Sequence, residues 1–482
     1  MLSRPQPTAR RSERPAGPRR PTVAIVGAGA SGTFVAAQLL RAASQRGSRL
    51  RAVLIDRREH NGGVAYSTSN PSHRLNVTAA RMSALPAAPD DFVRWRARTV
   101  GSSDPGAYAP RGEYRRYLGD LLSTAQLEAN SEVTLARLVA DVDTVEPLGS
   151  HVQLRFAGGG TLDADAAVLA LGNLPALTPH GCEGVTGHAA YVNDPWAPGA
   201  LDRLDPAARG VVLLIGTGSR WSTSRSRSRP AVHAPRCSRC RGVVCSRGPI
   251  CRGARPPPPA AVKLDPESSL PALVDVILAE AAAGHRCWHQ LVDDLRPVTQ
   301  ALWKRLSIEQ QAGFLASHHR AWCVHRHRMP PEVAAILAEL LQSGRLQVRG
   351  GSIALAPAAT DALEARISGV DRLKVERAIN CTGPGLDPRA SRDPLIRQLL
   401  TDGVVRAHPL GVGFDTAPEG AFRSRDGTPH RRLFTLGPTR VGELYETTAI
   451  SEIREQARAV AELLVTRLAG GSRSEHLDAK SA

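Results

Sequence analysis

The sequence predicts an α/β protein of the Rossmann-like type, in which a second unit of the same type is inserted into the first. Two apolar strands, VAIV and VLLI, each run directly into a glycine-rich turn, at Gly27 and at Gly216. After the second turn, the chain contains two further apolar strands that end in Gly-Pro, within INCTGP and LFTLGP. A strand that enters a glycine turn is typical of a nucleotide-binding β-α unit, and the later strands indicate that the first unit resumes. We therefore predict a first unit at 21–205 plus 370–470 and a second at 206–369.

Length and composition agree with a globular protein of two or three domains. The chain has 482 residues, of which 42% are hydrophobic and 22% charged. Since no run of 18 apolar residues occurs, we expect no membrane-spanning helix. Residues 1–20 are rich in Arg and Pro and contain no apolar stretch of a secretory signal, so we predict a disordered basic tail and a cytoplasmic protein. A second disordered tail is expected at 471–482.

The net charge of +17 is concentrated in two short stretches. Six Arg lie in residues 1–20, and ten lie in 219–255 without any Lys, Asp or Glu. The rest of the chain is close to neutral. A nucleic-acid surface spreads basic residues over folded elements with aromatic residues between them, and these Ser/Pro/Arg-rich stretches lack that pattern. The charge therefore does not predict a nucleic-acid partner.

The first glycine-rich turn has the spacing of a dinucleotide site. Gly27, Gly29 and Gly32 form G-x-G-x-x-G between the strand VAIV and a helix with apolar residues at helical spacing. The first glycine permits the tight turn, the second lets the backbone approach a pyrophosphate, and the third allows the helix to pack closely on the strand. Asp56 ends the next strand, where a carboxylate can accept hydrogen bonds from ribose hydroxyls.

The second glycine-rich turn is not followed by a helix pattern. Gly216 and Gly218 begin a fingerprint, but the next residues read SRWSTSRSRSRPAVHAPRCSRCRGVVCSRG. Four cysteines there, Cys237, Cys240, Cys245 and Cys251, allow a zinc site or a redox C-x-x-C pair. A third interpretation is a shifted reading frame over about 219–259, because SRWSTSRSRS can be encoded so that a one-base shift yields the amphipathic LTMVDVALAL. In that case 219–259 is not the native sequence.

Several longer motifs resemble one known family. The chain is similar to the bacterial FAD-NAD(P)-binding flavoproteins, distant relatives of the two-dinucleotide-domain monooxygenases that hydroxylate nitrogen or perform Baeyer–Villiger oxygen insertion. The matching stretches cover most of 21–465: VAIVGAGASG, GGVAYSTSNPSHRLNVTAARMSALP, DDFVRW, AVLALGN, NDPW, VLLIGTG, LRPVTQALW, VHRHRMPPEVA, INCTGP and GELYETTAISEIREQA. The resemblance implies a three-layer, Rossmann-like FAD-binding domain with an inserted NAD(P)H-binding domain.

The resemblance also implies cofactor contacts. The FAD contacts carried over by it are Gly27, Gly29, Ser31, Gly32 and Asp56, and the flavin-side loop comprises 62–66 and 75–77, including Asn76. Many relatives end with Gly-Asp beside the flavin, whereas here Gly437 is followed by Pro438, so backbone amides near Gly437 replace that carboxylate. By the same resemblance, Gly216 and Gly218 would contact NAD(P)H.

Other side chains leave two interpretations open. Arg111 with Tyr114 and Tyr117, and Arg296 with Gln300 and Trp303, either line a cleft for an anionic substrate or pack as ordinary core. The histidines 318, 319, 325 and 327 lack a convincing set of metal ligands, and no metal is predicted. Cys381 fits a buried strand residue. No catalytic residue follows from spacing.

The expected function is an FAD-dependent, NAD(P)H-using oxidoreductase, monooxygenase-like and acting on a small molecule. The alternative is a non-catalytic or decayed FAD/nucleotide-binding protein whose NAD(P)H site is impaired, because 219–259 as written offers no helix for the second dinucleotide. The sequence indicates neither the substrate, nor the choice between NADH and NADPH, nor the oligomeric state.

Overall fold

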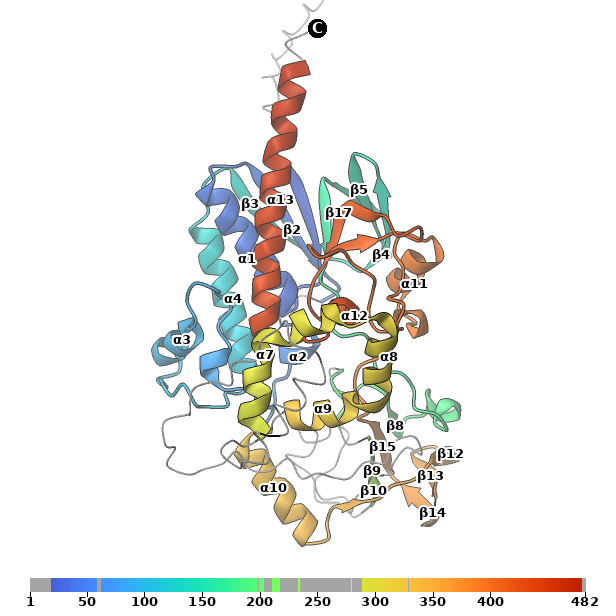
Figure 1. Ribbon diagram of the computed structural model, residues 1–482. Helices are drawn as coiled ribbons and strands as arrows, with labels where there is room; N and C mark the ends of the chain where they lie inside the picture. Colours follow the sequence, from blue (N-terminus) through green and yellow to red (C-terminus); the bar gives the residue numbers. More distant parts are fainter. Residues whose placement is uncertain are drawn as a thin grey trace, which may run out of the picture.

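The computed structural model describes residues 19–58, 62–197, 199–202, 210–216, 233–234, 279, 288–327, 329–368 and 370–478. In Figure 1 a large sheet with its helices occupies the upper part and a smaller sheet the lower part. Between them lie α7 (Trp288–Arg305), α8 (Ile308–Ser317) and α9 (His319–Arg326). Within the described residues no helix is both long and apolar enough to cross a membrane.

The large sheet has six strands in the order β16-β17-β7-β1-β2-β3. All neighbours are parallel except the edge strand β16. The strands are β1 (Thr22–Val26), β2 (Leu50–Asp56), β3 (Val133–Val139), β7 (Ala166–Leu169), β16 (Ala421–Arg423) and β17 (Pro429–Thr435). Since β16 and β17 come from the end of the chain, the first unit is interrupted and then completed, as the sequence predicts.

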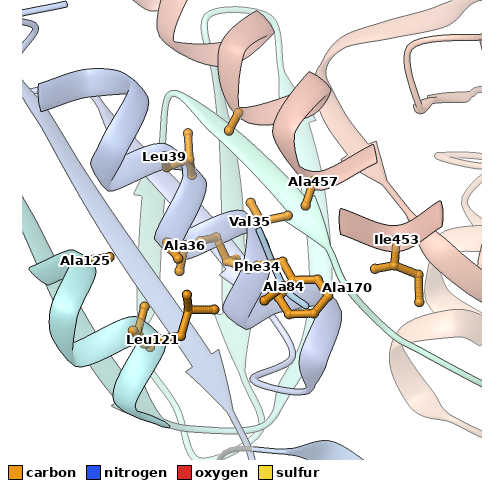
Figure 2. Packing of buried hydrophobic residues seen from close by; sticks show 14 of the residues in the cluster. Phe34, Val35, Ala36, Leu39, Ala84, Leu121, Ala125, Ala170, Ile453 and Ala457 are labelled. Carbon is orange, nitrogen blue, oxygen red and sulfur yellow. The ribbon is translucent and has the colours of Figure 1, made fainter. Parts of the chain in front are cut away.

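Three helices cover one face of this sheet. They are α1 (Ala30–Gln45), α4 (Arg111–Leu127) and α13 (Ile450–Asp478), and α1 packs against both others. Val23 and Ile25 of β1 point into this layer, where Figure 2 shows Phe34 and Val35 of α1 facing Ile453 and Ala457 of α13. The short helices α2 (Gly63–Tyr66), η1 (Ala79–Arg81) and α3 (Asp91–Thr99) lie in the connection before α4.

An antiparallel sheet covers the opposite face. Its strands are β4 (Val142–Leu148), β5 (His151–Phe156) and β6 (Thr161–Ala164), and α11 (Pro394–Thr401) packs beside β4. Ala24 and Val26 of β1 point into this second core, so alternate residues of one strand serve opposite layers. The three-layer architecture is therefore confirmed.

The smaller sheet repeats the same arrangement. Its parallel strands β8 (Tyr191–Val192), β15 (Arg377–Asn380) and β9 (Val212–Ile215) lie in that order. The antiparallel strands β12 (Ile353–Ala359), β13 (Ala362–Ile367) and β14 (Val370–Val375) share one core with it, and α10 (Pro331–Gln342) covers the other side. β10 (His233–Ala234), inside the suspect segment, pairs with β11 (Gln347–Val348).

The boundaries of the second unit differ from the expected 206–369. β8 precedes that range, while β14 and β15 follow it and yet pair with β13 and β9. Strand pairing over long sequence distances decides which unit a four-residue strand joins, and apolar content alone does not. On this pairing we place the second unit at about 191–380 rather than at 206–369.

The expected tails and one expected helix also differ. Arg19 pairs with Asp165 at 2.8 Å, so the first unit begins within the predicted tail 1–20, whose first 18 residues lie outside the described residues. α13 continues to Asp478, because each residue added to an existing helix gains a hydrogen bond, so 471–478 is helical. The sequence pattern predicts one helical segment at about 288–316, but the structure has two helices, α7 (Trp288–Arg305) and α8 (Ile308–Ser317), because Ser307 and Gln310 form a capping box. α9 (His319–Arg326) follows.

Candidate functional site

The first glycine turn has no room for side chains at two of its glycines. Gly27 has φ +102°, and a Cβ on it would lie 2.5 Å from the Ala170 carbonyl oxygen. A Cβ on Gly32 would lie 1.8 Å from the carbonyl oxygen of Gly27. The Gly27 N–H donates to the Ile55 oxygen at 2.7 Å, which fixes the turn above the ends of β1 and β2. The first and third glycines are thus required by the backbone itself.

The start of α1 offers free backbone donors. Its N-cap is Gly29, which has an extended conformation and provides no side-chain hydrogen bond. The first amides of a helix have no partner within the helix, and together with the helix dipole they favour an anionic group such as a phosphate. A Cβ on Gly29 would come no closer than 3.6 Å to another atom, the Cα of Gly63. A side chain at Gly29 would therefore make only ordinary van der Waals contact, unlike one at Gly27 or Gly32.

Asp56 lies beside this turn at the end of β2. Its Oδ2 accepts a hydrogen bond from the Ala28 N–H at 2.7 Å, and its Oδ1 accepts one from the Arg58 N–H at 3.0 Å. A carboxylate has about four acceptor positions, so both oxygens retain capacity for ribose hydroxyls. The structure brings Asp56 to the glycine turn, as the G-x-G-x-x-G spacing predicts.

The expected flavin-side loop packs directly on the first turn. Gly62, at φ +114°, donates its N–H to the Ala28 oxygen at 3.2 Å and forms a parallel bridge with Gly29. Arg111 donates from Nη1 to the Ala65 oxygen at 2.9 Å, which holds this loop. Nearby, the half-buried Asn76 follows the buried Leu75.

Gly437 comes from the far end of the chain to the same place. It follows β17, has φ +73°, and begins η4 (Gly437–Arg440). A Cβ on it would lie 3.3 Å from the Ser31 Oγ, so Gly437 and Ser31 are close neighbours. The N–H of Gly437 already donates to the Gln456 Oε1 at 2.9 Å, so any amide contact to a cofactor here has to come from neighbouring residues.

The turn and its neighbours fit an FAD molecule. Gly27 and Gly32 make the turn too tight for side chains, and α1 begins directly after Gly29 without a side-chain cap. Asp56 supplies acceptors on one side of the turn, and residues 62–66 and 437 lie on the other. These features suit the adenosine ribose, the pyrophosphate and the flavin of FAD, in that order from Asp56 across the turn to the other side.

The second glycine turn repeats the first at its beginning. Gly216 has φ +99°, and a Cβ on it would lie 2.9 Å from the backbone of Thr382. The Cys381 N–H donates to the Ile215 oxygen at 2.7 Å, which ties β15 to this turn. Gly218 and the four clustered cysteines lie outside the described residues. Cys381 itself is fully buried, as expected for a strand residue.

The two candidate substrate-cleft groups pack as core and ion pairs. Tyr114 and Tyr117 are buried among Phe92 and Trp95, and the Tyr117 hydroxyl donates to Asp91 at 2.7 Å. In the second group, Arg296 pairs with Glu452 at 2.6 Å. Trp303 donates from Nε1 to the backbone oxygen of Gly442, and Gln300 donates from Nε2 to the backbone oxygen of Glu446. These contacts account for the side chains of the second group and for Tyr117 without a substrate, whereas the buried Tyr114 hydroxyl has no hydrogen-bond partner among the described residues.

The histidine-rich segment belongs to a contact between α9 and the residues before α13. Arg326 pairs with Glu446 at 3.2 Å, and the Trp322 Nε1 donates to the same carboxylate at 2.7 Å. Burial lowers the pKa of His319, whose Nδ1 lies 3.0 Å from the Tyr445 hydroxyl. Among the described residues, no three His, Cys, Asp or Glu side chains lie together in a way that could hold a metal.

Residues 445–447 and Gln456 are structurally important, and sequence patterns did not identify them. Tyr445 has φ 59° and ψ −68°, and the Glu446 N–H donates to the Leu444 oxygen at 2.7 Å, which makes a classic γ-turn after α12 (Val441–Leu444). This conformation is rare for a residue with a side chain, and Tyr445 is held in it by stacking on Trp303. Contacts of this kind join side chains that are far apart in the sequence, so no repeating pattern of residue types predicts them.

Comparisons with known proteins agree with this geometry. Residues 24–174 match the protein family described as FAD-NAD(P)-binding. No curated protein matches the chain by sequence. The structure of reduced ornithine hydroxylase from Pseudomonas aeruginosa is similar with a TM-score of 0.60 and 15% identity, over 93% of this chain and 100% of that chain.

Two further structures extend this similarity. Ornithine N-hydroxylase from Kutzneria sp. 744, with reduced FAD, NADP+ and L-ornithine, has a TM-score of 0.56 and 16% identity, over 93% of this chain and 99% of that chain. L-lysine 6-monooxygenase from Pseudomonas syringae has a TM-score of 0.55 and 15% identity, over 92% and 99%. At these identities the likeness establishes the fold. Residues 24–174 thus match the FAD-NAD(P)-binding family, in a chain that has the fold of the ornithine and lysine hydroxylases.

Proposed function

We propose that this protein is an FAD-dependent, NAD(P)H-using oxidoreductase of the monooxygenase type that acts on a small molecule in the cytoplasm. The observation that carries the proposal is the first glycine turn, where Gly27 and Gly32 exclude side chains and α1 begins with free amides. The similarity to hydroxylases over nearly the whole chain supports an enzyme of this class rather than a nucleotide-binding protein without activity.

Each part of the site has a role in this proposal. The amides at the start of α1 and the backbone at Gly29 would hold the FAD pyrophosphate, and Asp56 would accept hydrogen bonds from the ribose. Residues 62–66 and the Gly437 turn would enclose the flavin side. The bound flavin would supply the redox chemistry, while the protein binds and orients it and excludes water. The second unit would present NAD(P)H, with Gly216 and Gly218 at the start of its dinucleotide turn.

The test is cofactor binding followed by turnover. The purified chain should bind FAD, and NADPH or NADH added without oxygen should bleach the flavin absorbance. With oxygen present, a small primary amine such as ornithine or lysine is the first substrate to try, because the structural neighbours named above act on these. Coupled consumption of NAD(P)H and oxygen supports a monooxygenase. Nicotinamide turnover that leaves oxygen untouched would favour a reductase.

The segment 219–259 requires a matched pair of proteins. One carries the sequence as given, and the other carries the residues that a single shifted frame would encode between codons 219 and 259. Resequencing the DNA over codons 210–265 shows which of the two is native. If the DNA confirms the given sequence, and FAD binds but neither nicotinamide bleaches it, the protein is the non-catalytic or decayed alternative. If only the reframed protein is reduced, the second dinucleotide site depends on that segment.

A further inference from the structure

Both backbone polar groups of Gly437 are bound by side chains. Its N–H donates to the Gln456 Oε1 at 2.9 Å, and its carbonyl oxygen accepts from the Thr447 Oγ1 at 3.1 Å. The Gln456 Nε2 in turn donates to the Thr447 Oγ1 at 2.7 Å. Three hydrogen bonds thus close a ring through the backbone of Gly437 and two side chains. Because the Gly437 N–H can only donate, the ring also fixes which end of the Gln456 amide faces it.

The ring fixes Gly437 itself, while other hydrogen bonds, such as that from the Thr439 Oγ1 to the Leu436 oxygen at 3.1 Å, hold the residues on either side. Gly437 has a left-handed φ of +73°, and Pro438 after it has no N–H to donate. Thr447 is fully buried, so its hydroxyl has no access to water as a substitute partner. Ile453, which is one turn before Gln456 on α13, lies 3.5 Å from the position of a Cβ on Gly437. α13 therefore holds the turn both by packing and by the Gln456 amide.

The ring also adjoins the γ-turn at Tyr445. Thr447 follows Glu446, whose carboxylate is held by Trp322 and Arg326 of α9. The segment 445–447 is thus held by the inserted helices on one side and tied to the Gly437 turn on the other. Any shift of Thr447 would move the turn that lies against Ser31 at the start of α1.

From these contacts we infer that Thr447 and Gln456 are positioning residues for the cofactor, which orient the Gly437 turn against the FAD site without touching the reacting atoms. The inference rests on the proposed function, because it gives the turn a cofactor to face. The ring acts by fixing the orientation of the Gly437 turn. Its effect should appear in FAD affinity more than in the stability of the protein without cofactor.

The test compares the dissociation constant of FAD, measured by flavin fluorescence, with the melting temperature of the same protein without FAD. Thr447→Val keeps the shape and removes the hydroxyl, which breaks two bonds of the ring, so we expect FAD affinity to fall about tenfold or more. Thr447→Ser restores the hydroxyl and should restore affinity. Arg458→Gln, an exposed change on the same helix, is the matched control and should leave affinity unchanged.

A second variant keeps the test decisive if Thr447→Val does not fold. Gln456→Glu still accepts from the Gly437 N–H but cannot donate, so the Thr447 hydroxyl is drawn to the carboxylate and the bond to the Gly437 oxygen opens. We expect a smaller loss of affinity and a changed visible spectrum of bound FAD. The double variant should lose less than the sum of both single losses, since the ring acts as a unit.

The outcomes separate the inference from the proposed function. Normal FAD affinity and spectra in Thr447→Val and Gln456→Glu, with a wild type that binds FAD, overturn the inference and leave the function intact. Equal losses in Thr447→Ser and Thr447→Val also overturn it. If the wild-type protein, pure and folded, binds no FAD, the proposed function fails and the inference fails with it.

Discussion

The two glycine turns begin alike and then diverge. Gly27 and Gly216 have φ values of +102° and +99°, and each lies against the residues that follow a neighbouring strand, Ala170 and Thr382. In each unit the strand before the turn accepts a hydrogen bond from that neighbouring segment, from the Ala170 N–H to Val26 and from the Cys381 N–H to Ile215. After Gly27 the chain forms α1, with its apolar face buried against the sheet. After Gly216 the sequence has no apolar period.

The difference shows that a strand and its glycine turn are specified separately from the helix that completes a dinucleotide site. Pairing of β9 with β15 suffices to place Gly216. The turn requires only a short apolar strand of four residues followed by a glycine. A helix needs an apolar face over several turns, since most of its stability comes from packing. The segment 219–259 as written lacks such a face, so the cofactor site of the second unit depends on residues that the turn geometry does not constrain.

The largest expected effect is at the third glycine of the first turn. Gly32→Ala would place a Cβ 1.8 Å from the Gly27 oxygen, and backbone rather than a flexible side chain has to move. We expect a loss of about 3 kcal/mol or more in the free energy of unfolding, together with the loss of FAD binding. Urea unfolding and the FAD content of the purified protein measure the two effects.

Gly29→Ala is the matched control for that change. Its Cβ would meet nothing closer than 3.6 Å and its φ is −70°, so the fold should tolerate it. FAD affinity should still fall, because the second glycine is the one that lets the backbone approach the pyrophosphate. A Gly32→Ala protein as stable as Gly29→Ala would contradict the packing of α1 on the first turn.

Next in size is a change beside the second turn. Asn380, fully buried at the end of β15, donates to the Leu177 and Asn193 oxygens at 2.9 and 3.0 Å and accepts from Thr382. Asn380→Asp keeps the shape but turns two donors into an acceptor facing other oxygens. We expect a loss of about 2 to 3 kcal/mol, confined to the second unit. Hydrogen exchange should show faster exchange in β9 and β15, and equal acceleration in β1 would mean that the two units unfold together.

Gly216→Ala tests the second turn itself. The φ of +99° and the 2.9 Å approach to Thr382 make alanine unfavourable by about 1 to 2 kcal/mol. The cost should be below that of Gly32→Ala, because the Cβ at 216 needs a shift of about one ångström less to clear its neighbour. FAD affinity should remain at the wild-type value. Loss of FAD binding in Gly216→Ala would show that the second turn supports the first.

The sequence predicted the first turn well because each of its parts has a local signal. The strand, the three glycines and the apolar face of α1 are all visible as residue types at fixed spacing. The capping box at Ser307 also has a local signal, Ser followed three residues later by Gln, and it divides the helical pattern of 288–316 into two helices. The boundary at β15 and the ring at Gly437 had no such signal, because they depend on contacts between residues far apart in the chain.

The smallest expected effect concerns the pH dependence of stability in the first unit, and it comes from a half-buried histidine. His408 lies against Gly442, where a Cβ on the glycine would come 2.3 Å from the imidazole Cγ. Burial lowers the pKa of His408, although the nearby Asp415 and Glu443 oppose this effect and Arg406 adds to it. In the folded protein the imidazole is therefore neutral at a pH where the unfolded chain binds a proton.

Because the folded pKa of His408 lies below its unfolded value of about 6.5, the unfolded state takes up more protons once the pH falls below that value. His408 thus contributes stability above about pH 6.5 that is lost on acidification. Its Nδ1 accepts from the Leu410 N–H at 3.3 Å, and His408→Asn can keep an acceptor there without a titrating ring. Unfolding measured from pH 8 to 5.5 should therefore show a flatter pH dependence in the variant. An unchanged slope would assign the acid sensitivity to other groups, and faster hydrogen exchange in β9 than in β1 on acidification would place those groups in the second unit.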